Sequence, residues 1–459
     1  MRSHHYAGTM TTLVWFRDDL RLADHAALDA GAQDPEGVAA LYVLDEESPE
    51  VRPLGGAARW WLHESLSRLQ ESLAAHGIPL ILRRGPASAV VPRVIEEVGA
   101  TRFTWNRRYG AERNIDAALK TQLRDAGIDA ESFHGGLLFD PRQIQTQTGG
   151  PYRVYSAFWR ACLAAPAPAV PLPEPEHLIP AAHQAASDSL DDWQLQPSRP
   201  DWATEIAERW TPGEEAALGA LDRFLRHRAP GYSRGRDFPA EEVTSELSPH
   251  LRWGEVSPRT IWHRAIASGA DVGTFLSELG WREFAWYTLF RHPDLHTRGL
   301  DARFEAFPWL DSAAPETAAT LTAWQQGRTG FPLIDAGMRE LWRSGTMHNR
   351  VRMVVASFLT KNLLIDWRIG EAWFWDTLVD ADAASNPFNW QWVAGCGADA
   401  APYFRIFNPR TQQEKFERQG TYIDRWAPES LLHPEIVDLR ETRIRALAAY
   451  DTARNTNPA

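Results

Sequence analysis

Short apolar segments alternate with longer amphipathic segments throughout residues 11–135, and this alternation restricts the fold more than any other feature of the chain. The apolar segments predict β-strands at TLVWF (12–16), VAALYVL (38–44), IPLILR (78–83), TRFTWN (101–106) and IDAESFH (128–134). The segments between them predict helices over 24–32, 56–77, 87–99 and 112–127. Strands joined through helices pair in parallel, so we predict an α/β, doubly wound parallel sheet. No GxGxxG follows the first strand, which argues against the usual dinucleotide-binding fingerprint.

The rest of the chain divides into a connector and a helical region. Residues 166–203 are rich in proline, alanine and acidic residues, which predicts a connector that crosses the surface between two lobes. From residue 204 the pattern is helical, as in the amphipathic segment 214–229. We therefore expect an α/β domain over 11–165, an interdomain linker over 166–203 and an all-α domain over 204–459.

Composition excludes several classes of protein. The two cysteines, Cys162 and Cys396, exclude a disulfide framework and a four-thiolate cluster made by this chain alone. No apolar stretch is long enough to span a bilayer, and residues 1–10 lack the apolar core of a signal peptide. We expect a cytoplasmic monomer without a metal site, translated from Met1 or Met10. The net charge of -12 argues against wholesale wrapping of nucleic acid, but arginines gather between 228 and 410, which predicts a local basic face with salt-sensitive binding.

Charged residues interrupt an apolar helical pattern over residues 349–366. Arg352 lies in the first turns of this predicted helix, and Asp380 and Asp382 follow on the next segment. These three residues have two interpretations. They can form an internal salt bridge and a helix cap, or the pair can leave one acceptor free for a ligand in a buried site.

Two other segments have the same ambiguity. TSELS (244–248) has small hydroxyl residues at a predicted helix start, where they can cap the helix or bind an anion. Glu278 and Trp281 lie one turn apart on a predicted helix over 274–290, so they share a face. That face belongs either to an amphipathic core helix with one exposed acid or to a site that bonds and stacks a base.

Several long motifs, in this order, resemble the DNA photolyase and cryptochrome family. They are FRDDLRLADH (16–25), GGPYRVYSAFWRACL (149–163), MHNRVRM (347–353), VDADAASNPFNWQW (379–392) and DAAPYFRIFNP (399–409). The resemblance implies an antenna-binding α/β domain, a helical domain that binds FAD, and an FAD that is active in its reduced anionic form. GGAARWWLHESL (55–66) and DAGMRELW (335–342) are similar to the branch nearest the plant cryptochromes.

The resemblance also assigns roles to individual residues. FAD would be bound by Tyr232, Thr244, Ser245, Leu247, Ser248, Phe275, Arg352, Asp380, Asp382 and Asn386. The DNA lesion would be contacted by Glu278, Trp281, Asn349, Arg350, Met353 and Trp392, with Glu278, Asn349 and Asn386 as the catalytic residues. Electrons would reach the flavin through Trp309, Trp367 and Trp390. Glu112 either contacts the antenna, which we expect to be methenyltetrahydrofolate rather than a deazaflavin, or is a solvated residue at a helix start.

The activity implied by the resemblance is light-dependent repair of cyclobutane pyrimidine dimers in DNA, a carbon–carbon lyase reaction. The main alternative is a cryptochrome, a blue-light photoreceptor that does not repair; Asn386 favours repair, because plant photoreceptors usually carry aspartate there. A photolyase for the (6-4) lesion would need a histidine in place of Asn349, and a dark flavin oxidoreductase would need a nicotinamide site. Three residues depart from the family pattern. Thr346 stands where many relatives have an aromatic residue, and Pro387 and Phe388 stand where small residues are often found.

Overall fold

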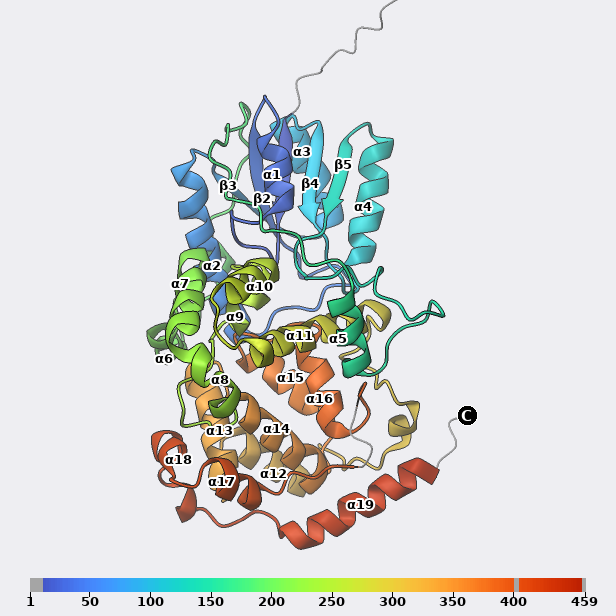
Figure 1. Ribbon diagram of the computed structural model, residues 1–459, viewed down its shortest axis with the longest axis vertical. Helices are drawn as coiled ribbons and strands as arrows, with labels where there is room; N and C mark the ends of the chain where they lie inside the picture. Colours follow the sequence, from blue (N-terminus) through green and yellow to red (C-terminus); the bar gives the residue numbers. More distant parts are fainter. Residues whose placement is uncertain (1–10, 400–403, 456–459) are drawn as a thin grey trace, which may run out of the picture.

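The computed structural model describes residues 11–399 and 404–455. The alternative start at Met10 and residues 400–403 of the DAAPYFRIFNP motif lie outside the described residues. Figure 1 shows two lobes, with the parallel sheet and its helices above and a larger helical lobe below. Helices α11, α15 and α16 lie near the middle of the view, and α9 and α10 lie between them and the sheet lobe.

The sheet has five parallel strands in the order β3-β2-β1-β4-β5. They are β1 (Thr12–Phe16), β2 (Val38–Leu44), β3 (Leu80–Arg84), β4 (Arg102–Asn106) and β5 (Asp129–Phe133). Val14 of β1 pairs with Ala40 of β2 and Thr104 of β4. The predicted fold class is confirmed, and each predicted strand lies within two residues of the observed one at both ends.

Both faces of the sheet are covered, which explains why its strands are apolar throughout. Val14 and Phe16 pack on one face with α1 (Ala26–Ala32) and α2 (Gly56–Ala75). Leu13 and Trp15 point to the opposite face, where α3 (Ala87–Val98) and α4 (Arg113–Asp125) cover them. The alternation of side chains along each strand therefore contributes to two cores at once.

The helical lobe accounts for most of the remaining chain. Its α-helices, with those that precede it, are α5 (Tyr155–Ala164), α6 (Thr204–Arg209), α7 (Glu214–Arg223), α8 (Ala229–Gly235), α9 (Ser248–Arg252), α10 (Pro258–Ala267), α11 (Gly273–Arg291), α12 (Pro315–Gln325), α13 (Pro332–Ser344), α14 (Asn349–Ser357), α15 (Trp367–Thr377), α16 (Ser385–Ala394), α17 (Pro409–Phe416), α18 (Thr421–Trp426) and α19 (Leu439–Asn455). Short 3-10 turns lie at Asp191–Trp193, Ala302–Ala306 and Ser430–Leu432.

Two of the predicted helices contain a π-helical turn. The turn Phe224–Arg228 joins α7 to α8, and the turn Phe358–Asn362 extends α14. The helix predicted over 349–366 therefore ends at Asn362. Leu364 has a φ of 51°, a left-handed conformation that does not continue a helix, and Asp366 caps α15 by accepting a hydrogen bond from the Arg368 amide (2.9 Å).

The connector packs along the sheet lobe. The backbone carbonyl of Ile179 accepts a hydrogen bond from Val38 of β2 (2.7 Å), and the amide of Asp188 donates to Leu82 of β3 (2.9 Å). Trp193 is 4% exposed and packs in the core under α2. This contact anchors the segment before the chain enters the helical lobe.

Buried polar contacts join the two lobes. Arg259 of α10 forms a two-bonded ion pair with Asp24 before α1 (3.0 and 2.6 Å), and both side chains are at most 9% exposed. Trp61 of α2 donates its indole N–H to Glu255 Oε1 (2.9 Å). Arg52, in the segment before α2, pairs with Glu371 of α15. Each lobe thus supplies partners for polar groups that the other lobe buries.

Candidate functional site

A cavity of about 510 Å³ opens among α8, α9, α11, α14 and α16. Its volume is within the range of small-molecule and cofactor sites. The residues expected at the site that line it are Tyr232, Ser245, Leu247, Ser248, Phe275, Glu278, Trp281, Asn349, Arg350, Arg352, Met353, Asp380, Asp382, Asn386, Trp390 and Trp392. Segments far apart in sequence therefore meet at one site.

An ion pair between a half-buried arginine and a buried carboxylate closes one side of the cavity. Arg352 Nη2 and Nη1 donate to Asp380 Oδ2 (2.9 Å) and Oδ1 (3.1 Å), and Ser248 Oγ donates to Asp380 Oδ2 (2.7 Å). Arg352 Nε also donates to the carbonyl of Met347 (2.8 Å). Because the fork of hydrogen bonds fixes the guanidinium plane, this part of the wall is rigid.

Asp382 caps the helix that follows it. Its Oδ1 accepts from the amide of Ala384 (2.8 Å), and its Oδ2 accepts from the hydroxyl of Ser385 (2.9 Å) at the start of α16. The salt bridge and helix cap that the sequence allowed are both present. The same carboxylates also line the cavity, so the structural and ligand-binding interpretations are compatible.

Asn386, in the first turn of α16, is 8% exposed and also lines the cavity. Its amide nitrogen donates to the carbonyl (3.0 Å) and to the carboxylate Oε1 (2.8 Å) of Glu371 on α15. Sequence reasoning missed Glu371. A single acid within the aromatic segment WRIGEAWFW was the signal that it is buried and paired.

The wall formed by α11 presents Phe275, Glu278 and Trp281 to the cavity. Tyr155 of α5 stacks on Trp281 with ring centroids 3.7 Å apart. Glu278 forms an ion pair with Arg236, which the sequence marked only as part of a basic cluster. Burial lowers the pKa of Arg236, but the Glu278 pair outweighs it and the pKa lies above its usual value.

The opposite wall is formed by α14 and α16. Asn349 and Met353 come from α14, and Trp392 comes from α16. Arg350 donates to Asp237 (2.7 Å) and its guanidinium lies 4.5 Å from the ring centroid of Phe416.

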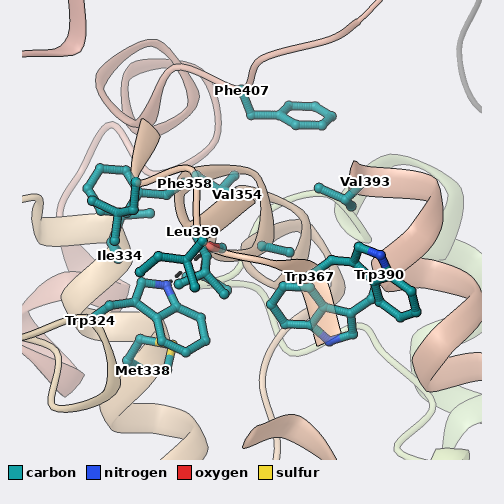
Figure 2. Packing of buried hydrophobic residues seen from close by; sticks show 14 of the residues in the cluster. Trp324, Ile334, Met338, Val354, Phe358, Leu359, Trp367, Trp390, Val393 and Phe407 are labelled. Atoms are coloured by element: carbon teal, nitrogen blue, oxygen red, sulfur yellow. Dashed lines mark hydrogen bonds between the residues drawn. The ribbon is translucent and has the colours of Figure 1, made fainter. Parts of the chain in front are cut away.

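The three tryptophans expected to carry electrons belong to one apolar cluster. Trp390 lines the cavity and is 2% exposed, and Trp367 is 1% exposed. Figure 2 shows both residues among the buried side chains of this cluster in the helical lobe. Trp309 is half-buried at the edge of this cluster, where it packs on Phe307 with centroids 4.2 Å apart.

Some sequence expectations fall outside the cavity lining. Thr244 contributes its carbonyl to Arg228 (3.0 Å) and does not line the cavity, and TSEL precedes α9 as a loop. Glu112 lies in the sheet lobe at the start of α4, where burial raises the pKa of its carboxyl.

The three departures from the family pattern have different placements. Thr346 accepts a hydrogen bond from Arg352 (3.4 Å) and does not line the cavity. Pro387 and Phe388 lie within α16 rather than in a loop, and Phe388 packs on Phe284 with ring centroids 5.6 Å apart.

The donor set fits a flavin nucleotide. Hydroxyls of Tyr232 and Ser245 and the guanidinium of Arg236 line the cavity and are groups that bind phosphate. Burial raises the pKa of Tyr232 to about 12, so its hydroxyl remains a donor at neutral pH. Phe275 and Trp390 provide apolar surface for an aromatic ring system. Within residues 11–399 and 404–455 no group of three or more His, Cys, Asp and Glu side chains is placed to hold a metal ion, and no helix there is long and apolar enough to cross a membrane.

Comparisons with known proteins match segments of both lobes. Residues 12–176 match the family model for DNA photolyase, and residues 275–435 match the model for the FAD binding domain of DNA photolyase. The deoxyribodipyrimidine photo-lyase of Agrobacterium fabrum is 46% identical, over 98% of this chain and 99% of that protein. Cryptochrome-1 of Arabidopsis thaliana is 37% identical, over 91% of this chain and 63% of that protein. Among solved structures, a bacterial class III photolyase from Agrobacterium tumefaciens has a TM-score of 0.92 and 44% identity, over 99% of this chain and all of that one (100%). The chain therefore belongs to the DNA photolyase and cryptochrome family.

Proposed function

We propose that this protein is a deoxyribodipyrimidine photo-lyase that uses FAD and blue light to split cyclobutane pyrimidine dimers in DNA. One observation carries the proposal. A set of side chains suited to a flavin and a set suited to a flipped-out base line the same cavity. Arg352, Asp380 and Asn386 belong to the first set, and Glu278 and Trp281 belong to the second.

FAD would be held by the residues that fit its parts. Tyr232, Ser245 and Ser248 would bind its phosphates, and the Arg352–Asp380 pair would lie against its ring system. Asn386 would face its reactive ring nitrogen. Bound in its reduced anionic form, FAD would supply the single electron that splits the dimer under blue light.

The chain's own side chains position the lesion. A damaged pair leaves the duplex at a lower energetic cost than an intact one, which assists its entry into the cavity. Glu278 would bond the polar edge of the dimer, and Trp281, Met353 and Trp392 would exclude water from its rings. Glu278 must share or release Arg236 to do so, since the two are paired in the structure. Asn349 would contact both the flavin and the lesion.

The photoreceptor alternative has less support. Asn386 matches the residue of repair enzymes, and the Agrobacterium relatives, whose names describe photolyases, resemble the chain more closely than Cryptochrome-1 does. The methenyltetrahydrofolate antenna at Glu112, the monomeric state and the cytoplasmic location stay predictions.

The test is repair of a dimer-containing oligonucleotide by the purified protein with reduced FAD, in blue light and in darkness. We expect repair only in light, and a loss of at least tenfold in Glu278→Ala. Glu71→Ala is the matched control, because Glu71 also pairs with an arginine (Arg68, 2.9 Å) but lies exposed on α2. Dimers that persist in light while the flavin undergoes normal photoreduction would favour the photoreceptor instead.

A further inference from the structure

Asn386 presents its amide oxygen to the cavity because its amide nitrogen is already engaged. The nitrogen donates to the Glu371 carbonyl (3.0 Å) and to Glu371 Oε1 (2.8 Å). A backbone carbonyl can only accept a hydrogen bond, so the nitrogen must face Glu371 and the oxygen must point away from it. Among the residues that the structure describes, none donates a hydrogen bond to this oxygen.

An arginine from the sheet lobe holds Glu371 in place. Arg52 donates from Nη1 and Nη2 to the two carboxylate oxygens of Glu371 (2.7 and 2.9 Å). Its guanidinium also lies over Trp375, 4.1 Å from the ring centroid. The Glu371 side chain is only 2% exposed, whereas that of Arg52 is 23% exposed. The fork of two hydrogen bonds fixes both the position and the plane of the carboxylate.

The charge of Arg52 also favours the ionised form of Glu371, which can only accept hydrogen bonds. Burial raises the pKa of Glu371, and the Arg52 ion pair acts in the opposite direction. Without Arg52, burial would act on Glu371 with less opposition and favour its protonated form. Its O–H would then be a donor beside Asn386, so an amide turned with its oxygen toward Glu371 and its nitrogen toward the cavity would gain this bond and give up the one to the Glu371 backbone carbonyl (3.0 Å).

We propose that Arg52 is a positioning residue for the flavin site, which it controls from the other lobe through Glu371 and the orientation of the Asn386 amide. The inference rests on the proposed function, in which the reactive ring nitrogen of FAD faces Asn386. An oxygen at this position favours the form of that ring nitrogen that carries a proton, whereas an amide nitrogen favours the form without it.

The test is the one-electron reduction potential of bound FAD, measured by spectroelectrochemical titration of the purified holoprotein. In Arg52→Gln we expect the equilibrium constant for uptake of one electron and one proton to fall about two- to tenfold, which corresponds to the loss of one hydrogen bond. Arg52→Lys should recover part of this change, because it restores the charge but not the fork. Asp376→Ala is the control. It removes a bond between the same two segments, from the Gly56 amide to Asp376 (2.8 Å), and should leave the potential unchanged.

The Asn386→Ala variant distinguishes an effect of Arg52 through the Asn386 amide from a general effect of Arg52 on the structure. In Asn386→Ala, which lacks the amide, Arg52→Gln should cause no further shift in the potential. An equal shift in both backgrounds, or an unchanged potential in Arg52→Gln, overturns the role of Arg52. A wild-type protein that binds FAD and repairs dimers while Arg52→Gln has no effect rejects this inference alone, whereas a wild-type protein without FAD or repair rejects the proposed function.

Discussion

Replacing Gly370 with alanine would place a methyl group inside the packing around Trp390. Gly370 lies in α15, and a Cβ there would be 2.6 Å from Leu359 Cδ2 and closer still to Cη2 and Cζ3 of the Trp390 ring. Carbon atoms in contact lie about 3.5–4.0 Å apart. Leu359 and Trp390 are 0% and 2% exposed, so neither can move toward solvent. The indole ring must therefore shift.

The expected magnitude combines two opposing effects. Overpacking a dense core costs about 1–3 kcal/mol. Alanine regains up to about 1 kcal/mol over glycine within a helix. Several atoms of a rigid ring must shift, so the overpacking cost should lie in the upper part of its range, at about 2–3 kcal/mol. After the helix gain of about 1 kcal/mol, we expect Gly370→Ala to lower the free energy of unfolding by about 1–2 kcal/mol.

Gly219→Ala provides a matched control within α7. Its Cβ would meet only the end of the flexible Arg223 side chain, at 3.4 Å, so it should raise the free energy of unfolding by up to about 1 kcal/mol. Urea unfolding of both variants with FAD bound, followed by circular dichroism, measures the two changes. Shifts of the same sign in the two variants, or a Gly370→Ala protein as stable as wild type, would refute the packing argument.

Three further predictions concern the site and its surroundings. Arg352→Ala should lower the free energy of unfolding by about 3 kcal/mol and weaken FAD retention because it leaves Asp380 buried without its cation, whereas Arg343→Ala, in an exposed pair, should cost less than about 1 kcal/mol in the same urea assay. Trp390→Phe should slow photoreduction of oxidised flavin at least tenfold, measured as bleaching under blue light, while chemically reduced protein still repairs dimers; equal photoreduction in the variant would contradict the electron-transfer role. Burial raises the pKa of Glu283 to about 7, so between about pH 4.5 and 7 the folded state keeps a proton that the unfolded state has lost, and wild-type stability falls as pH rises through that window. Urea unfolding at several pH values measures the difference in the free energy of unfolding between Glu283→Gln and wild type. This difference should grow by up to about 3 kcal/mol from pH 4.5 to 8. A difference that does not change with pH would contradict the raised pKa of Glu283.

The sheet lobe could be predicted closely from the sequence because its signals are local. Each strand is a short apolar segment and each helix has its own amphipathic period, so the boundaries fall within two residues of the prediction. The end of α14 could not be predicted, because the apolar pattern continues past Asn362 and only the left-handed conformation of Leu364 breaks it. Such a conformation in a leucine depends on tertiary packing that a local pattern does not contain.

The cavity residues were found because family motifs name them, but their partners were not. Glu371 looked like one acid among aromatic residues, and its cation, Arg52, lies 319 positions earlier in the chain. The partner of Trp281 is Tyr155, from a helix that precedes the connector. Pairings over such distances come from docking of the lobes, which neither periodicity nor residue spacing encodes.

The polar seam between the lobes limits how the protein can be divided or recombined. Asp24 and Glu255 are completely buried, at 0% exposure, and the ion pair of Asp24 with Arg259 and the hydrogen bond of Trp61 to Glu255 cross from one lobe to the other. A lobe produced alone would keep one member of each contact and lose the other, which is more destabilising than lacking both. A chimera that takes its sheet lobe from a relative therefore needs matching residues at these positions and at Arg52. The two lobes are separate in shape, but these shared contacts require them to be engineered as one unit.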